Sequence, residues 1–90
     1  MMVHIFISGK VQGTGFRQFV KYHAKNLNVA GWITNLPDGR VEAVFQGPEN
    51  KVKEMIKVSK RGPFLADVEN VEVDWNQKPD ADIIDFQIIK

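Results

Sequence analysis

Short apolar stretches, most of which alternate with polar residues, are separated along this 90-residue chain by two longer stretches with apolar residues three and four positions apart. A period of two is typical of β-strands, and the longer spacing is typical of one face of an amphipathic α-helix. The predicted order is β-α-β-β-α-β with a short fifth strand at the end. The strands are residues 3–8, 31–36, 40–46, 71–75 and 85–90, and the helices are residues 17–28 and 48–61.

The first strand and the hairpin after the first helix determine the expected arrangement of the sheet. Residues 3–8 carry apolar groups on both faces, which favours a central position in the sheet over an edge. The sequence Leu-Pro-Asp-Gly at residues 36–39 is typical of a turn and joins the second and third strands as a hairpin. Helices interleaved with strands in this way pack on one face of an antiparallel sheet, so we expect an α+β sandwich of the ferredoxin-like type.

The apolar stripes of the two helices are expected to cover the core. They comprise Phe16, Phe19, Val20, His23 and Leu27 in the first helix and Val52, Met55, Ile56 and Ser59 in the second. Because His23 lies on its stripe, we interpret it as a packed core histidine and not as a catalytic base. His4 has no evident acidic or histidine partner nearby in the sequence. Phe64 and Leu65, in the loop after the second helix, are expected to fold back and cap the core.

The composition is that of an ordinary globular protein, with 43% hydrophobic and 26% charged residues. Ninety residues suffice for one core but not for two, so we expect a single domain over residues 1–90. The absence of cysteine excludes disulfides, thiolate nucleophiles and zinc–thiolate sites. No apolar run approaches membrane-spanning length and the N-terminus lacks a secretory pattern, so a cytoplasmic location is expected.

Charge is unevenly distributed although the net charge is only +1. Residues 1–61 hold ten Lys/Arg and four Asp/Glu, which gives +6, whereas residues 62–90 hold two Lys and seven Asp/Glu, which gives −5. This polarity could steer an anionic substrate toward the N-terminal half. The plainer interpretation is that most of these basic residues form the solvated surface of the helices.

A glycine-rich turn, residues 9–17, connects the first strand to the first helix. Its glycines allow positive φ angles and a close approach of the backbone to a ligand. Amide groups of a turn that leads into a helix N-terminus converge on an anion. Arg17 ends the turn, and its planar fork of donors suits a phosphoryl or carboxylate group. We therefore interpret the turn as a site for a small anion and expect a phosphoryl group there.

Two common nucleotide-binding motifs do not match this turn. A Walker-type phosphate loop requires a Gly-Lys-Ser/Thr ending that is absent, and a dinucleotide fingerprint would require glycine at position 18, which is Gln18. A tight strand-to-helix turn, in which the glycines serve only geometry, is equally compatible with residues 9–17 taken alone. With two histidines and no cluster of acids, a metal site is not expected.

A second motif distinguishes between these alternatives. Residues 9–17 follow the pattern Gly-x-Val-Gln-Gly-x-x-Phe-Arg, residues 31–41 follow Gly-Trp-x-x-Asn-Leu-Pro-Asp-Gly-x-Val, and Gly47 comes six residues later. Together these motifs closely resemble the acylphosphatase family, and the resemblance extends over the whole chain in length and element order. It implies metal-independent hydrolysis of the carboxyl–phosphate bond of small acyl phosphates to a carboxylate and inorganic phosphate, without a cofactor.

The resemblance also implies roles for individual residues. Arg17 and Asn35 would be catalytic, with the Arg17 guanidinium on the phosphoryl group and the Asn35 side chain orienting the attacking water. The phosphate-binding residues would be Gln12, Gly13, Thr14, Gly15, Phe16 and Arg17. The chain departs from the family pattern at Thr14, where valine is usual, and at Ile33 and Thr34, but both catalytic positions are intact.

Two non-catalytic functions remain as alternatives: an RNA-binding module and an anion-binding domain of the same fold. The RNA-recognition fold has the same element order, but residues 39–46 lack the paired aromatic residues that stack bases, and Glu42 would repel the backbone. We therefore expect a monomer that acts on a small-molecule acyl phosphate, with neither nucleic acid nor membrane as a partner.

Overall fold

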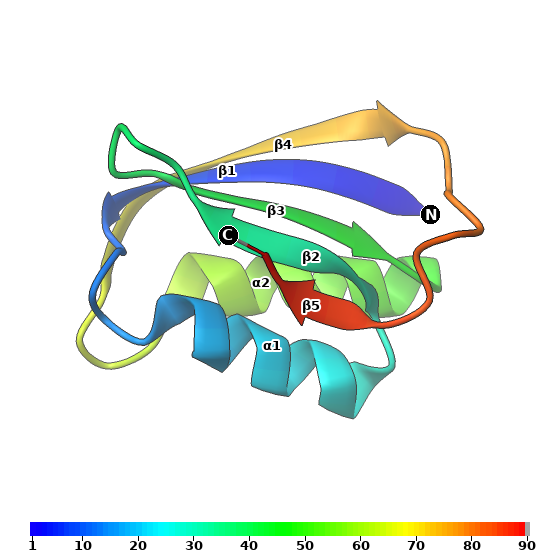
Figure 1. Cartoon of the computed structure of the whole chain (residues 1–90), viewed down its shortest axis with the longest axis horizontal. Helices are drawn as coiled ribbons and strands as arrows, with labels where there is room; N and C mark the ends of the chain where they lie inside the picture. Colours follow the sequence, from blue (N-terminus) through cyan, green and yellow to red (C-terminus); the bar gives the residue numbers. More distant parts are fainter. Residues whose placement is uncertain (90) are drawn as a thin grey trace.

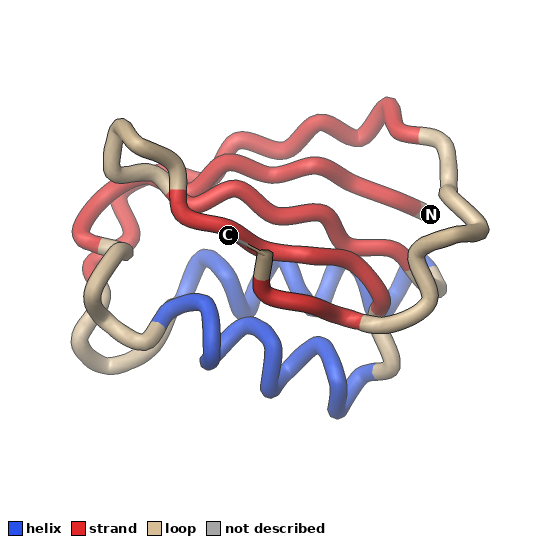
Figure 2. Tube along the Cα trace, in the orientation of Figure 1, coloured by secondary structure: helices blue, strands red, loops and turns tan. Residues whose placement is uncertain are grey.

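The computed structural model describes residues 1–89 and contains five strands and two helices in the predicted order. The strands are β1 (Met2–Lys10), β2 (Ala30–Asn35), β3 (Val41–Gln46), β4 (Asp67–Gln77) and β5 (Phe86–Ile88), and the helices are α1 (Phe16–Leu27) and α2 (Glu49–Arg61). Both helices lie on one side of the sheet (Figures 1 and 2), so the predicted ferredoxin-like sandwich is confirmed.

The strands lie in the order β4-β1-β3-β2-β5, with β1 in the interior as its two apolar faces predicted. The pairs β1–β3, β1–β4 and β2–β3 are antiparallel, whereas β5 runs parallel to β2, so the sheet is mixed at this edge. The amide of Gly31 donates to the Asp85 carbonyl at 2.8 Å, and the amide of Ile89 donates to the Ile33 carbonyl at 2.9 Å. The predicted last strand reached residue 90, which lies outside the described residues.

The core lies between the sheet and the helices. Val3, Ile5 and Ile7 of β1 are fully buried, as are apolar side chains on the inward faces of α1 and α2. The predicted helix stripes are confirmed in their main members, which are Phe16, Val20, Val52, Met55, Ile56 and Ser59. Burial of this apolar surface is the main source of stability in a chain of this size.

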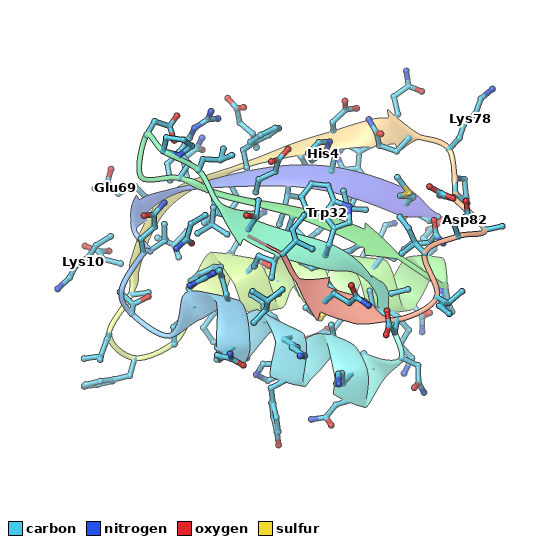
Figure 3. The ribbon with its side chains drawn as sticks, viewed as in Figure 1. His4, Lys10, Trp32, Glu69, Lys78 and Asp82 are labelled. Carbon is cyan, nitrogen blue, oxygen red and sulfur yellow. The ribbon has the colours of Figure 1, made fainter. Side chains whose placement is uncertain are left out.

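The opposite face of the sheet is not covered by a helix, and His4 and Trp32 lie on it (Figure 3). Here one expectation from the sequence is wrong, because His4 does have an acidic partner. Its Nε2 lies 2.7 Å from Oε2 of Glu42 on β3, and its ring stacks on Phe6 with the centroids 4.9 Å apart. The partner is 38 residues away in the sequence and becomes a neighbour only through the β1–β3 pairing.

The prediction that Phe64 and Leu65 cap the core is also wrong. Phe64 is fully exposed and Leu65 is 65% exposed. After Gly62 the chain makes a turn in which the amide of Ala66 donates to the Pro63 carbonyl at 3.0 Å, and this turn directs the two side chains outward. Phe16 and Val68 occupy the space beside Gly62, at the start of this turn.

Smaller differences concern element ends. Helix α2 begins at Glu49 and not at Pro48, because ψ of Pro48 is 144°, an extended and not a helical value. Strand β4 (Asp67–Gln77) is longer than the predicted residues 71–75 at both ends. The prediction was too short because exposed acidic residues interrupt the alternation of apolar and polar positions. No helix within residues 1–89 is long and apolar enough to cross a membrane.

Candidate active site

The turn between β1 and α1 has the backbone conformation that its glycines suggested. Gly13 and Gly15 have φ angles of 73° and 79°, in the left-handed region that other residues rarely adopt. A Cβ atom at either position would meet nothing within 4 Å, so the requirement for glycine is conformational and not steric. Gly15 is the N-cap of α1, whose first turn contains neither a capping side chain nor an acidic residue. The first amides of the helix therefore remain available for an anion.

Two side chains hold this turn in place. The Thr14 side chain is buried, and its hydroxyl donates to the Val11 carbonyl at 2.6 Å across the turn. The side-chain amide of Gln12 donates to the carbonyls of Leu36 at 2.7 Å and Arg40 at 2.9 Å. Because these bonds use both amide hydrogens of Gln12, the backbone N–H is the donor that this residue has left for a ligand.

Asn35 is the last residue of β2, directly before the turn that Gln12 contacts. The turn is closed by the amide of Leu36, which donates to the Arg40 carbonyl at 2.8 Å. Asp38 accepts hydrogen bonds from the backbone amide and the side chain of Arg40, and these bonds lower the pKa of its carboxyl group below the usual value. Oδ1 of Asn35 is buried, and it has no hydrogen-bond partner within residues 1–89.

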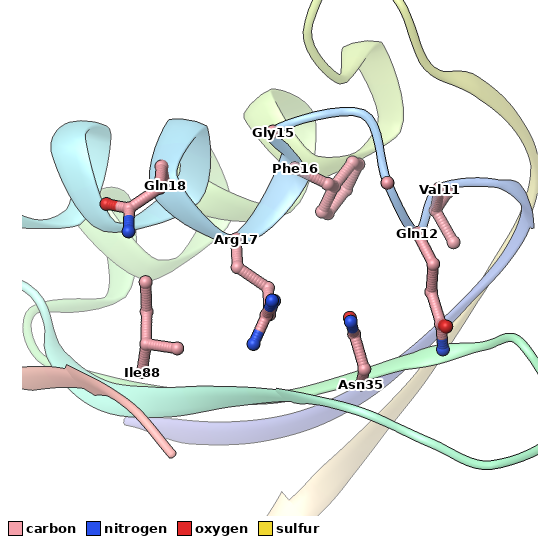
Figure 4. A pocket seen from close by; sticks show the side chains of 9 residues that line it. Val11, Gln12, Gly15, Phe16, Arg17, Gln18, Asn35 and Ile88 are labelled. Atoms are coloured by element: carbon pink, nitrogen blue, oxygen red, sulfur yellow. The ribbon is translucent and has the colours of Figure 1, made fainter. Parts of the chain in front are cut away.

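A cavity of about 310 Å³ lies between the glycine turn and the end of β2 (Figure 4). Arg17 and Asn35 both line it, although they come from a helix and a strand, and their side chains point into the same space. The other lining residues are Val11, Gln12, Gly13, Gly15, Phe16, Gln18 and Ile88. All the predicted site residues thus lie at the cavity except Thr14, whose hydroxyl is turned to the Val11 carbonyl.

Sequence reasoning missed Val11, Gln18 and Ile88 as cavity residues. Gln18 adjoins the recognised motif and could have been inferred from its position at the start of α1. Ile88 is more than 70 residues from Arg17, and only the parallel pairing of β5 with β2 brings it to the cavity. No local pattern in the sequence specifies that pairing.

Arg17 dominates the electrostatics of the cavity. Of the lining residues in the part of the chain described, it alone carries a charge, and it takes part in none of the ion pairs found there. Residues 1–89 contain no group of three or more His, Cys, Asp or Glu side chains placed to hold a metal ion. The cavity thus offers a guanidinium, helix-start amides and the buried oxygen of Asn35, which is unpartnered within the described chain, a combination suited to an anion with a water beside it.

Comparison with known proteins gives a consistent result. The family model described as Acylphosphatase matches residues 3–88. An acylphosphatase of Roseiflexus sp. is 46% identical over 96% of this chain and 91% of its own length, and one of Caldivirga maquilingensis is 51% identical over 80% and 77%. The crystal structure of acylphosphatase from Bacillus subtilis superposes with a TM-score of 0.94 at 34% identity, covering 99% of this chain and 98% of that one. The chain belongs to the acylphosphatase family.

Proposed function

We propose that this chain hydrolyses the carboxyl–phosphate bond of small acyl phosphates, with the backbone amides of residues 12–17 and the Arg17 guanidinium on the phosphoryl group and Asn35 on the attacking water. One observation carries the proposal: a single small cavity is lined by Arg17 and by Asn35, whose side-chain oxygen is buried without a protein partner in the described chain. Membership of the acylphosphatase family supports the same reaction.

The anion side of the cavity supports phosphoryl binding. Helix-start amides and a guanidinium are both donors, and each is stronger toward an ionised oxygen than toward a neutral one. In phosphoryl transfer the charge is spread over the three equatorial oxygens of the transferred group, so fixed donors around those oxygens stabilise the transition state. Because Thr14 and Gln12 hold the turn in position, little reorganisation is needed when the substrate binds.

Asn35 supports the role of the water. A buried carbonyl oxygen without a hydrogen bond costs about 1–3 kcal/mol, and a water that donates to it removes this cost. Such a water keeps a lone pair free for phosphorus. In the proposed step the water oxygen–phosphorus bond forms, the phosphorus–acyl oxygen bond breaks, and the acyl group leaves as a carboxylate. The proton of the water passes to a phosphoryl oxygen, and the second product is inorganic phosphate.

The reaction needs few groups because its leaving group is good. A carboxylate requires no strong general acid, so catalysis consists of positioning and charge stabilisation. Arg17 and the amides would supply charge stabilisation, and Asn35 would supply positioning. Residues 1–89 contain no cluster of three or more side chains that could hold a metal ion. We infer that hydrolysis proceeds without one.

RNA binding by the uncovered face of the sheet is the alternative that the fold raises. His4, Phe6 and Trp32 do bring aromatic rings together on this face. However, His4 stacks on Phe6, and the Arg40 guanidinium lies 5.0 Å from the centroid of the Phe6 ring. The Phe6 ring is thus already in contact with His4 and Arg40, and Glu42 beside them would repel a nucleic-acid backbone. We infer that the substrate is a small molecule and that neither nucleic acid nor a membrane is a partner. We also propose that the chain is a cytoplasmic monomer.

A direct assay tests the proposal. Purified protein would be mixed with benzoyl phosphate, and release of inorganic phosphate would be followed beside a sample of the buffer alone. Rapid release in the presence of protein, with competitive inhibition by inorganic phosphate, is expected. Binding of phosphate without turnover would contradict hydrolysis and favour an anion-binding domain. Binding of single-stranded RNA, with neither phosphate binding nor turnover, would favour the RNA-binding alternative.

A further inference from the structure

We infer that Gln18 and Ile88 form the wall of the cavity that receives the acyl group, and that this wall favours apolar acyl groups over ionised ones; the inference rests on the proposed function. It assigns a specificity-determining role to two residues outside both sequence motifs. Gln18 is an exposed residue in the first turn of α1, and Ile88 is the last residue of β5.

The arrangement of the cavity separates these two residues from the water. In Figure 4 the Arg17 side chain lies in the middle of the cavity, with Asn35 and Gln12 on one side and Gln18 and Ile88 on the other. If the phosphoryl group lies on Arg17, Asn35 marks the side from which the water attacks. The attacking and leaving oxygens of a phosphoryl transfer are roughly in line. The acyl oxygen therefore leaves on the side away from Asn35, where Gln18 and Ile88 stand.

The chemistry of this wall is apolar with one neutral amide. Ile88 is half-buried and packs against the core, and its side chain gives the cavity an apolar surface. Gln18 offers a neutral donor and acceptor at the cavity mouth. Neither residue supplies a charge for an ionised group on the acyl chain. Burying such a group unpaired is costly, whereas an apolar group gains from contact with Ile88.

The cavity itself is small. At about 310 Å³ the cavity is near the lower end of the range of about 300–1,000 Å³ that is usual for small-molecule sites. The phosphoryl group and a water occupy part of that space. The remaining space receives the part of the acyl group next to the phosphoryl group, and larger acyl groups extend past Gln18 into solvent.

The first experiment removes the apolar wall. For Ile88→Ala, kcat/KM would be measured with benzoyl phosphate and with acetyl phosphate. The ratio of the two values should fall about fivefold or more relative to the unaltered chain, the size of effect that lost apolar contacts have on specificity. Ile84→Ala is the matched control, because Ile84 is 84% exposed and does not line this cavity. It should leave the ratio unchanged.

The second experiment adds a charge at a position where folding is not at risk. Gln18→Lys should raise kcat/KM for succinyl phosphate, which carries an ionised acyl chain, relative to acetyl phosphate by about threefold or more, as a partly screened charge pair allows. Asn26→Lys, also exposed but near the other end of α1, is the control for added charge and should not change this ratio.

The outcomes separate this inference from the proposed function. If the unaltered chain hydrolyses none of the three acyl phosphates, the proposed function is wrong. If it hydrolyses them but Ile88→Ala lowers kcat/KM for all equally, and Gln18→Lys changes no ratio, only the assignment of the acyl wall is overturned. Denaturant midpoints measured on the same samples identify a loss of folding, and Gln18→Lys decides the matter if Ile88→Ala does not fold.

Discussion

Arg17 and Asn35 face the same cavity but differ in the chemistry that they can perform. Arg17 is a fixed positive charge with several donors and, within residues 1–89, no ion-pair partner. Asn35 is neutral, and its buried Oδ1 can only accept a hydrogen bond. A phosphoryl group needs donors in the ground state and the transition state, whereas a water needs an acceptor that fixes its orientation. Replacing Arg17 and replacing Asn35 are therefore expected to change substrate binding and kcat differently.

Replacing Arg17 by lysine should nearly abolish turnover while the fold is retained. An ammonium group keeps the charge but cannot reproduce the planar pair of donors that a guanidinium presents to two phosphoryl oxygens. We expect kcat/KM to fall and competitive inhibition by inorganic phosphate to weaken together. Steady-state kinetics with an unchanged circular dichroism spectrum would check this. A variant with near-normal kcat/KM and near-normal phosphate inhibition would show that the Arg17 guanidinium does not bind the phosphoryl group.

At the scale of elements, the active site depends on contact between the glycine turn and the β2–β3 hairpin. Gln12 makes this contact through its two hydrogen bonds to the Leu36 and Arg40 carbonyls. Leu36 directly follows Asn35, so the same contact fixes the end of β2 that carries Asn35. Gln12 thus acts as a positioning residue, connecting the element that would hold phosphate to the element that would hold water.

Replacing Gln12 by methionine, which has a similar shape but no donors, tests this role. The free energy of unfolding should fall by about 1–3 kcal/mol, since two part-buried hydrogen bonds are lost, while each carbonyl keeps its backbone donor. In addition kcat should fall several-fold, because Asn35 and the turn are no longer held in register. Activity and denaturant unfolding would be measured on the same preparation.

Gln46 provides a matched control for this change. Its side-chain amide likewise bridges two carbonyls, those of Asp80 at 2.8 Å and Ile83 at 3.3 Å, and it does not line the cavity. Gln46→Met should lower stability and leave kcat of the folded protein intact. Equal losses of kcat in the two variants would mean that Gln12 matters for stability alone.

The elements differ in how far their sequences specify them. Local periodicity and turn residues specify strand β1, both helices and the hairpin. The fold could be predicted for this reason, and the structure confirms it. The parallel position of β5, the His4–Glu42 pair and the place of Ile88 in the cavity depend on contacts between distant segments, which no local pattern encodes. Phe64 and Leu65 illustrate the reverse error, since apolar character alone did not predict burial at a turn that directs both side chains outward.

For the site, the two motifs predicted that Arg17 and Asn35 belong together, and the structure places both at one cavity. The sequence could not reveal that the side chain of Gln12 is committed to the hairpin, because this depends on tertiary packing. It likewise gave no sign that the Asn35 oxygen is buried without a partner in the described chain.

At the scale of the whole molecule, we expect residues 1–90 to unfold as one unit. A shared core links all five strands to both helices, and domains of this size usually unfold in a single cooperative step. Denaturant unfolding followed by tryptophan fluorescence and by far-ultraviolet circular dichroism should therefore give the same midpoint. Two separated transitions would show that the chain contains units of independent stability.

Chelation should not inhibit the enzyme. The chain has no cysteine, and residues 1–89 contain no cluster of acids and histidines at ligand spacing. Turnover of benzoyl phosphate should be the same before and after dialysis against EDTA. A loss of turnover that a divalent ion restores would reveal a metal requirement and change the account of charge stabilisation.

Asn35→Ala separates a catalytic from a structural role of Asn35 when its effect on kcat is measured beside its effect on stability. If Asn35 orients the water, kcat should fall about 100-fold, roughly 3 kcal/mol, while KM and inhibition by phosphate stay nearly unchanged. If Asn35 only shapes the end of β2, the denaturant midpoint should fall and kcat of the folded fraction should remain intact. A destabilised but fully active variant would contradict the assignment of the water to Asn35.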